Sequence, residues 1–213
     1  MRIKKLNREI LDILYEMYPD AHCELEHETP FQLLIATVLS AQTTDKKVNQ
    51  VTRKLFSKYK NPQDFAALDY GDLEKEIKEI GLLRNKAKNI VNLSRDLIAK
   101  FNGEVPRTHE ELMSLPGVGR KTANVVLSNA YGIPALAVDT HVFRVSNRIG
   151  LATASNVEET EKQLTKEIPK DEWIKAHHSL IFHGRRICKA QNPNCAQCAL
   201  ASRCREYKKN NKK

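Results

Sequence analysis

The sequence predicts an all-α fold, and three observations carry that prediction. Apolar residues recur every three or four positions along almost all of the 213 residues, which is the spacing of one helix face. No pair of alternating apolar and polar runs flanks a tight Asn-Gly or Asp-Gly turn, as a β-hairpin requires. Residues that begin or end helices stand at the borders of the apolar runs.

The first half of the chain predicts six helices, taken in order. Residues 6–17 carry one apolar stripe, whereas residues 31–39 are apolar on both sides and predict a central helix. Asp45 stands where an N-cap is expected for a helix over 45–59. The helix over 73–80 is expected to stop at Gly81, and the helix over 90–101 at Asn102. Thr108 and Glu111 form the pattern of a capping box for a short helix over 108–115.

The second half predicts four more helices. One covers 121–131 and stops at Gly132, and the Ile133-Pro134 break that follows is a plausible domain edge. The others are expected over 139–149, 156–168 and 170–182.

Charge indicates a polyanionic partner. The chain has 35 Lys and Arg against 26 Asp and Glu, a formal charge of +9. Nine basic residues and one acid stand in the last 30 positions, so a net +8 lies there and only +1 elsewhere. Such a balance suits nucleic acid or an anionic surface. The end from Tyr207 to Lys213 fits equally a mobile tail that aids solubility.

Several protein classes are excluded. No apolar run approaches the roughly 18 residues of a membrane span, and the N-terminal residues lack the pattern of a signal peptide. We therefore expect a cytoplasmic, nucleoid-associated protein without membrane contact. In that reducing setting, clustered cysteines bind metal more often than they form disulfides.

A glycine-containing segment between two expected helices suggests a phosphate grip. It runs from Leu115 to Ala123 and includes Gly117, Val118 and Gly119, with Arg120 and Thr122 after them. Glycine lets the backbone approach another molecule, and the following helix N-terminus favours anions. Such a turn can hold a DNA backbone without reading its sequence. Arg144 and Arg148 nearby add positive charge to this setting. An ordinary helix connection is the alternative.

Four cysteines predict a metal centre. Cys188, Cys195, Cys198 and Cys204 are separated by six, two and five residues. Four thiolates so close in sequence suit a zinc ion or an iron–sulfur cluster, and ligand softness does not separate the two. Cys23 stands apart and is interpreted as a buried thiol. The histidines His177, His178 and His183 are interpreted as packing and supporting groups, since four cysteines already complete a site.

Lys121 and Asp139 are candidates for chemistry. A lysine amine is a nucleophile only when it is deprotonated, and a cleft beside a helix N-terminus favours that form. Asp139 is then a candidate proton acceptor. Taken singly, a surface lysine and an aspartate that caps a helix are the simpler interpretations.

These segments together resemble the endonuclease III family of DNA glycosylases. The resemblance rests on residues 115–123, on Val138 to His141 with Arg144, and on the cysteine spacing. Residues 39–45 and 80–87 also match, so it covers essentially the whole chain. It implies a six-helix barrel bearing a helix-hairpin-helix motif over 22–132. A second helical domain, formed by 1–21 and 133–213, is expected to hold a 4Fe-4S cluster on the four cysteines.

The resemblance also implies roles for single residues. Lys121 matches the catalytic lysine and Asp139 the catalytic carboxylate. Gln42 and Leu82 match the residues that enter the DNA stack and fill the gap left by an extruded nucleotide. Leu83 departs from the pattern, because relatives often carry an aromatic residue after the wedge leucine, and this puts the local packing against DNA in doubt.

The implied activity is that of a bifunctional DNA glycosylase and abasic-site lyase. It would excise oxidised pyrimidines from duplex DNA in base excision repair through a lysine Schiff base and β-elimination. Its partner would be duplex DNA with damaged pyrimidines or abasic sites, bound by a monomer. Two alternatives stay open: an adenine-specific mismatch glycosylase, which normally lacks the lysine and has an added C-terminal domain, and a non-enzymatic DNA-binding module with a zinc-held tail.

Overall fold

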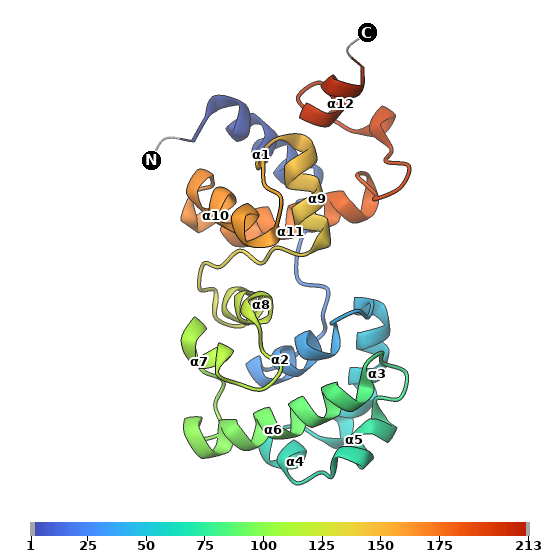
Figure 1. The fold of residues 1–213 in the computed structure, drawn as a ribbon, viewed down its shortest axis with the longest axis vertical. Helices are drawn as coiled ribbons and strands as arrows, with labels where there is room; N and C mark the ends of the chain where they lie inside the picture. The colour runs from blue at the N-terminus through green and yellow to red at the C-terminus, as the bar shows by residue number, and fades with distance from the viewer. Residues whose placement is uncertain (1–2, 212–213) are drawn as a thin grey trace. The chain divides into compact units, whose positions relative to one another are not determined.

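The structure is a computed structural model that describes residues 3–211 (Figure 1). These residues form helices and connecting loops, with no strand among them, as the sequence predicts. They divide into two compact units. One runs from Cys23 to Ile133, and the other combines the residues up to His22 with those from Pro134 onward. Lys212 and Lys213, part of the predicted basic tail, lie outside the described residues.

The unit from Cys23 to Ile133 is built around one buried helix. That helix, α2 (Pro30–Leu39), is buried at every position from Phe31 to Leu39 and contacts three neighbours, which confirms that it is central. The neighbours are α3 (Asp45–Lys58), α6 (Leu83–Phe101) and α8 (Arg120–Tyr131). A helix with no solvated face is stable only because other helices cover it on all sides.

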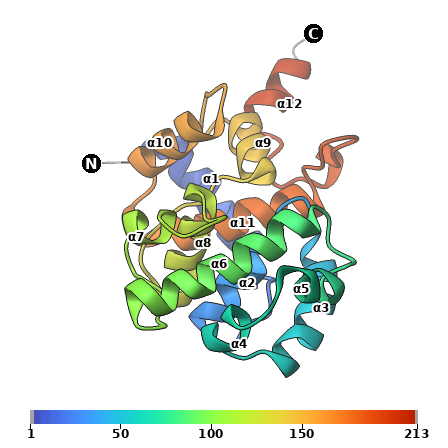
Figure 2. The ribbon, with the colours of Figure 1, turned by 60° about the horizontal axis from the view of Figure 1, so that its bottom comes forward.

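Three short helices complete this unit. Two of them, α4 (Pro62–Ala66) and α5 (Tyr70–Glu76), pack along α6, as Figure 2 shows. Phe65 of α4 and Leu73 of α5 are fully buried there. The third, α7 (His109–Met113), contacts α8 and forms a helical hairpin with it.

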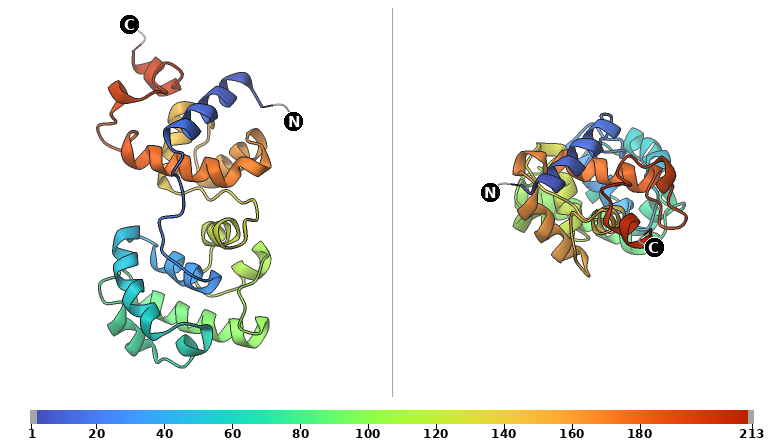
Figure 3. Two further views of the ribbon diagram at one scale, coloured as in Figure 1. Left: turned by 180° about the vertical axis from the view of Figure 1, so that it is seen from behind. Right: turned by 90° about the horizontal axis from the view of Figure 1, so that it is seen from above.

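The second unit is centred on α11 (Trp173–Arg186). It packs against α1 (Lys5–Met17) and α9 (Thr140–Ile149), and the views of Figure 3 agree on this arrangement. Leu14, Val145 and Leu180, one from each helix, are fully buried in the shared core. The remaining elements of this unit are α10 (Val157–Glu167), α12 (Arg205–Asn210) and the 3-10 turns η1 (Lys170–Glu172) and η2 (Cys195–Gln197).

Helix ends follow the predicted signals with three corrections. Asn102 and Gly132 end their helices in left-handed conformations, as expected. Thr44, and not Asp45, caps α3: its hydroxyl accepts from the Lys47 N–H at 3.4 Å. Asp45 is the first helical residue, where its charge suits the positive end of the helix. Helix α5 ends at Glu76, well before Gly81, and α7 ends at Met113, two residues before the predicted Leu115.

The C-terminal region is more ordered than predicted. Helix α12 includes Tyr207 to Asn210, for which a mobile tail was one of the two interpretations of the sequence. It contacts α9, and the Arg205 guanidinium donates to the Asn147 carbonyl. Among residues 3–211 no helix has the length and apolar character needed to cross a membrane.

Candidate active site and metal centre

The loop between α7 and α8 depends on a glycine at position 117. Gly117 has φ +78°, a left-handed conformation that other residues adopt at a cost of about 1–2 kcal/mol. A Cβ at this position would lie 2.7 Å from the side-chain nitrogen of Asn89 on α6. The turn then closes when the Val118 N–H donates to the Leu115 carbonyl at 3.1 Å. Both the backbone and the neighbouring helix therefore exclude a side chain here.

Gly119 is different, because nothing inside the molecule requires a glycine there. It is the N-cap of α8 with an ordinary φ of −96°, and an added Cβ would meet no atom within 4 Å. No side chain caps this helix end. A helix N-terminus leaves N–H groups without intrahelical acceptors and carries partial positive charge. The open space over Gly119 thus lets an outside acceptor approach.

Lys121 is the second residue of α8 and is exposed. Arg120 before it is also exposed, Thr122 is half-buried, and Ala123 faces the core. Lys121 forms no ion pair with the residues from 3 to 211. Its amine therefore stands in solvent at the positive end of a helix, uncommitted to any structural contact.

Asp139 has a definite structural role in the other unit. It is the N-cap of α9, and its Oδ1 accepts from the Val142 N–H at 2.7 Å. The side chain is half-buried. The simpler interpretation of this residue, an aspartate that caps a helix, is therefore confirmed. The cap uses Oδ1, and Oδ2 takes no part in it.

Gln42 and Leu82 share an unusual backbone conformation. Both are exposed, and both are left-handed, with φ +58° and +59°. The other non-glycine residues with positive φ between 3 and 211 are Asn102 and Asn192. Asparagine enters this region readily, whereas glutamine and leucine do so at a cost of about 1–3 kcal/mol each. Strain of this kind clusters at functional sites.

Each strained residue stands at a helix border. Gln42 is the third residue of a turn that closes when the Thr43 N–H donates to the Ser40 carbonyl at 3.1 Å, directly after α2. Leu82 is the N-cap of α6 and is 55% exposed, more than the other large apolar side chains among the described residues. Leu83 after it begins the helix and is half-buried.

The four clustered cysteines are half-buried in the unit with α11. Cys188 follows α11, Cys195 begins η2 and Cys198 follows it, and Cys204 is the N-cap of α12. Burial raises the pKa of the Cys198 and Cys204 thiols, and the charges of the neighbouring thiols add to this, so the four sulfurs share one region. Among residues 3–211 no three His, Cys, Asp or Glu are gathered as ligands of a single metal ion.

Two arginines of α9 hold the start of this cysteine loop. The Arg144 guanidinium donates to the Cys188 and Gly184 carbonyls at 3.1 and 2.9 Å. Arg148, one turn later, donates to the Lys189 carbonyl at 2.7 Å and lies 3.7 Å from the Cys188 sulfur. The sequence predicts that these charges belong to the setting of a DNA grip, and this stays a prediction. In the structure both arginines also order the cysteine loop.

His183 contacts the cysteine region, in line with its predicted supporting role, and Tyr18, which no sequence pattern singled out, contacts His183. Burial lowers the pKa of His183 to about 4, so the ring is neutral, and burial raises the pKa of Tyr18 to about 12, so the hydroxyl keeps its proton. That hydroxyl lies 3.0 Å from His183 Nδ1, and the other ring nitrogen lies 3.7 Å from Cys198 Sγ. The neutral ring therefore bridges Tyr18 and the cysteine loop.

The comparisons with known proteins bear on the whole chain. Residues 35–170 match the model of the HhH-GPD superfamily base excision DNA repair protein. Endonuclease III of Bacillus subtilis is 55% identical over 95% of this chain and 93% of the relative. A solved non-covalent complex of endonuclease III with DNA has a TM-score of 0.94 and 57% identity, and it covers all of both chains. A trapped covalent endonuclease III–DNA intermediate has the same TM-score and identity, over 99% of each chain.

These matches confirm the family and the fold predicted from the sequence motifs. The chain belongs to the endonuclease III family of the HhH-GPD superfamily, the bifunctional DNA glycosylases and abasic-site lyases of base excision repair.

Proposed function

We propose that this chain excises oxidised pyrimidines from duplex DNA and cleaves the strand at the resulting abasic site, with Lys121 as the nucleophile. One observation carries the proposal: an exposed, uncommitted amine stands in the first turn of α8, behind a glycine loop and an N-terminus that no side chain caps. Such a helix end attracts phosphate, and the amine beside it then faces the sugar next to that phosphate.

The chemistry follows from an amine and a deoxyribose. The Lys121 nitrogen forms a bond to C1′, the glycosidic bond breaks, and the base leaves with the bonding electrons and takes up a proton. Opening of the sugar ring gives a Schiff base. Loss of a proton from C2′ then breaks the C3′–O bond, so the strand is cut 3′ to the lesion.

Asp139 is proposed as the carboxylate that takes the proton of Lys121 and stabilises positive charge on the sugar. Its cap bond to Val142 supports this role, because it fixes the carboxylate and leaves Oδ2 unused by the cap. A group that is held by its own helix needs no reorganisation during the reaction.

DNA contacts are proposed for the glycine loop and for the two strained residues. Gly117, Val118 and Gly119, with Arg120 and Thr122, would hold the phosphates. Gln42 and Leu82 would enter the base stack once a nucleotide is extruded, and a damaged base leaves the stack more easily than an intact one. An exposed leucine in a strained conformation supports the role of Leu82.

A 4Fe-4S cluster is proposed on Cys188, Cys195, Cys198 and Cys204. Four half-buried cysteines of one loop are the donor set of such a centre, and by residue type alone they also suit zinc. The sulfurs are not gathered around a single ion, which a four-iron cluster does not require. When bound, the cluster supplies a fixed point that ties the loop together. The residues Arg144 and Arg148 order the start of the same loop through its carbonyls.

The first prediction concerns Lys121. With borohydride and duplex DNA that carries an abasic site, the wild type should form a covalent adduct, because borohydride reduces the Schiff base to a stable amine. Lys121→Gln should form none and should lose excision of an oxidised pyrimidine. Gel electrophoresis of the reduced mixture measures the adduct.

Lys88, an exposed lysine of α6, supplies the control, and Lys88→Gln should trap as well as the wild type. No adduct with the wild type, or equal trapping with Lys121→Gln, would overturn the proposal. Duplexes that each carry one defined lesion test the pyrimidine preference, which fails if oxidised pyrimidines are not excised.

A second prediction separates the two roles of Asp139. Asparagine caps helices as well as aspartate does, so Asp139→Asn should keep the unfolding free energy within about 0.5 kcal/mol. Its single-turnover excision rate should fall by about 10²- to 10⁴-fold, the usual effect of losing a proton-transfer group. Asn156→Ala removes the cap of α10 and should show the opposite pattern: a lower unfolding free energy and an unchanged excision rate. Excision by Asp139→Asn at the wild-type rate contradicts the assignment.

The third prediction compares the two glycines of the hairpin. Gly119→Ala introduces no clash, because its Cβ meets nothing, so it should lower the unfolding free energy by less than about 1 kcal/mol, the effect of a poorer N-cap. It should weaken binding to an abasic duplex by about tenfold, since a methyl group blocks the approach of a phosphate. Gly117→Ala should lower the unfolding free energy by about 1–2 kcal/mol or more. Fluorescence anisotropy at one fixed salt concentration and denaturant unfolding measure the two effects. Unchanged affinity with Gly119→Ala argues against the grip.

A fourth prediction concerns the metal centre. The purified protein should be brown, with about four iron and four sulfide per chain. Serine in place of Cys188 or Cys198 should lower the iron content, whereas Cys23→Ser, in the other unit, should not. A colourless protein with one zinc per chain would show that the centre is not iron–sulfur.

A further inference from the structure

Lys86 is a buried lysine to which neither the sequence motifs nor the proposed chemistry assigns a role. It is the fourth residue of α6 and is only 4% exposed. Its backbone N–H donates to the Leu82 carbonyl at 3.1 Å. Lys86 thus belongs to the first turn that Leu82 begins.

The ammonium group of Lys86 reaches in the other direction, to the loop that contains Gln42. It donates to the Leu39 carbonyl at 2.9 Å, to the Ala41 carbonyl at 2.6 Å and to the Thr43 hydroxyl at 3.3 Å. A lysine ammonium has three hydrogens, and these three acceptors use all of them. They flank Gln42 on both sides.

These bonds also complete the end of α2. Leu39 is the last residue of that helix, so its carbonyl has no intrahelical donor, and the negative end of the helix favours a cation. Burial lowers the pKa of Lys86, because it disfavours the charged form. The three oxygen acceptors counteract this effect by stabilising the ammonium. A group bound on all sides in this way leaves the loop little freedom.

We propose that Lys86 is a positioning residue that fixes Gln42 and Leu82 in their left-handed conformations, so that both side chains are ready to enter a DNA stack together. The inference rests on the proposed roles of Gln42 and Leu82. Strained conformations persist only where the surrounding structure over-determines them. The Lys86 ammonium holds the loop that contains Gln42, and it does so from the first helical turn that Leu82 begins. Its effect is therefore specific to duplex DNA, since a single strand has no stack to fill.

The test compares cleavage of an abasic site in a duplex with cleavage of the same strand alone. Lys86→Met keeps the length of the side chain and removes the three donors. Its single-turnover rate on the duplex should fall by about tenfold, while the rate on the single strand should stay within about twofold of the wild type. A loss of folded protein lowers both rates by the same factor, so the ratio of the two rates reports positioning alone.

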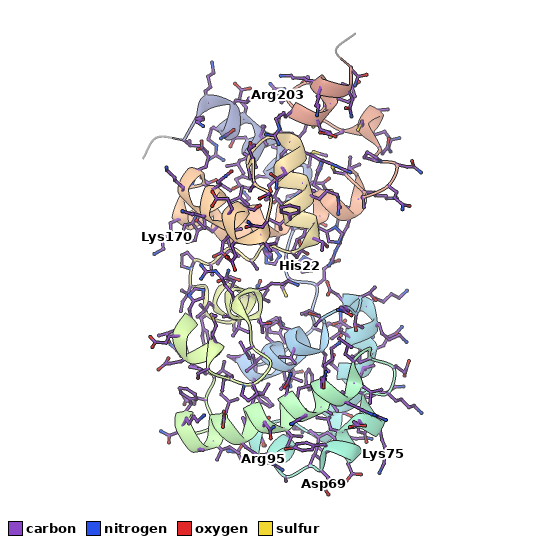
Figure 4. The ribbon with its side chains drawn as sticks, viewed as in Figure 1. His22, Asp69, Lys75, Arg95, Lys170 and Arg203 are labelled. Atoms are coloured by element: carbon purple, nitrogen blue, oxygen red, sulfur yellow. The ribbon has the colours of Figure 1, made fainter. Side chains whose placement is uncertain are left out.

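Two basic residues of α6 supply matched controls. Arg95, labelled in Figure 4, holds a different loop, because its guanidinium donates to the Ala66 carbonyl at 3.1 Å. Arg95→Met removes a comparable clamp far along the same helix, and Lys88→Met removes an exposed charge. Both should leave the duplex-to-single-strand ratio unchanged. Thr43→Val removes one acceptor only and should lower the ratio by a smaller factor, which keeps the test usable where Lys86→Met folds poorly.

The variant Gln42→Ala with Leu82→Ala separates this inference from the function on which it rests. If that double variant lowers the ratio and Lys86→Met and Thr43→Val do not, the role of Lys86 is overturned and the proposed function stands. If the double variant leaves the ratio unchanged, the proposed roles of Gln42 and Leu82 fail first. Added to the double variant, Lys86→Met should lower the ratio no further; a further fall would mean that it acts elsewhere and would also overturn the inference.

Discussion

The hydrogen bonds of the Lys86 ammonium are the interaction on which the exposed residues Gln42 and Leu82 of the larger helical unit depend. From the first turn of α6 the ammonium donates to the last carbonyl of the buried helix α2 and to the loop after that helix. Separating a buried cation from its acceptors costs several kcal/mol of stability. The end of α2, the loop after it and the first turn of α6 therefore do not move independently. Because α2 is covered on every side, the loop that leaves it starts from a fixed point. The strained conformations of Gln42 and Leu82 persist only because the surrounding structure is rigid.

In the second unit, arginines rather than a lysine hold an irregular loop. The cysteine loop has little regular structure, so its carbonyls need donors from elsewhere. Arg144 and Arg148, one turn apart on α9, supply them, and the N-cap that starts the same helix is Asp139. One helix therefore fixes both a carboxylate and the start of the cysteine loop. A substitution of a buried residue of α9 would disturb both Asp139 and the cysteine loop. Such a substitution therefore does not separate their two roles.

The sequence was sufficient for the fold class and for the family, because helical periodicity and helix-end residues are local signals. It located the central helix and the stops at Asn102 and Gly132. It was wrong by one residue at Thr44, since two adjacent residues were both good caps. The roles of Lys86 and Arg148 were out of reach, because their partners lie 40 or more residues away in the chain. The left-handed backbone of Gln42 and Leu82 left no trace in residue type either.

The two glycines of the hairpin show how structure separates folding from function when sequence treats them alike. Gly117 is demanded by its own φ and by Asn89, so its identity says nothing about a ligand. Gly119 is demanded by neither, and Lys121 is an exposed amine that stabilises nothing around it. A leucine that is strained and exposed, as Leu82 is, lowers stability twice, through its backbone and through its unburied surface. Residues of this second kind are unexplained by the folded chain alone, and the contacts proposed for them with a phosphate, a sugar and an open base stack would account for them.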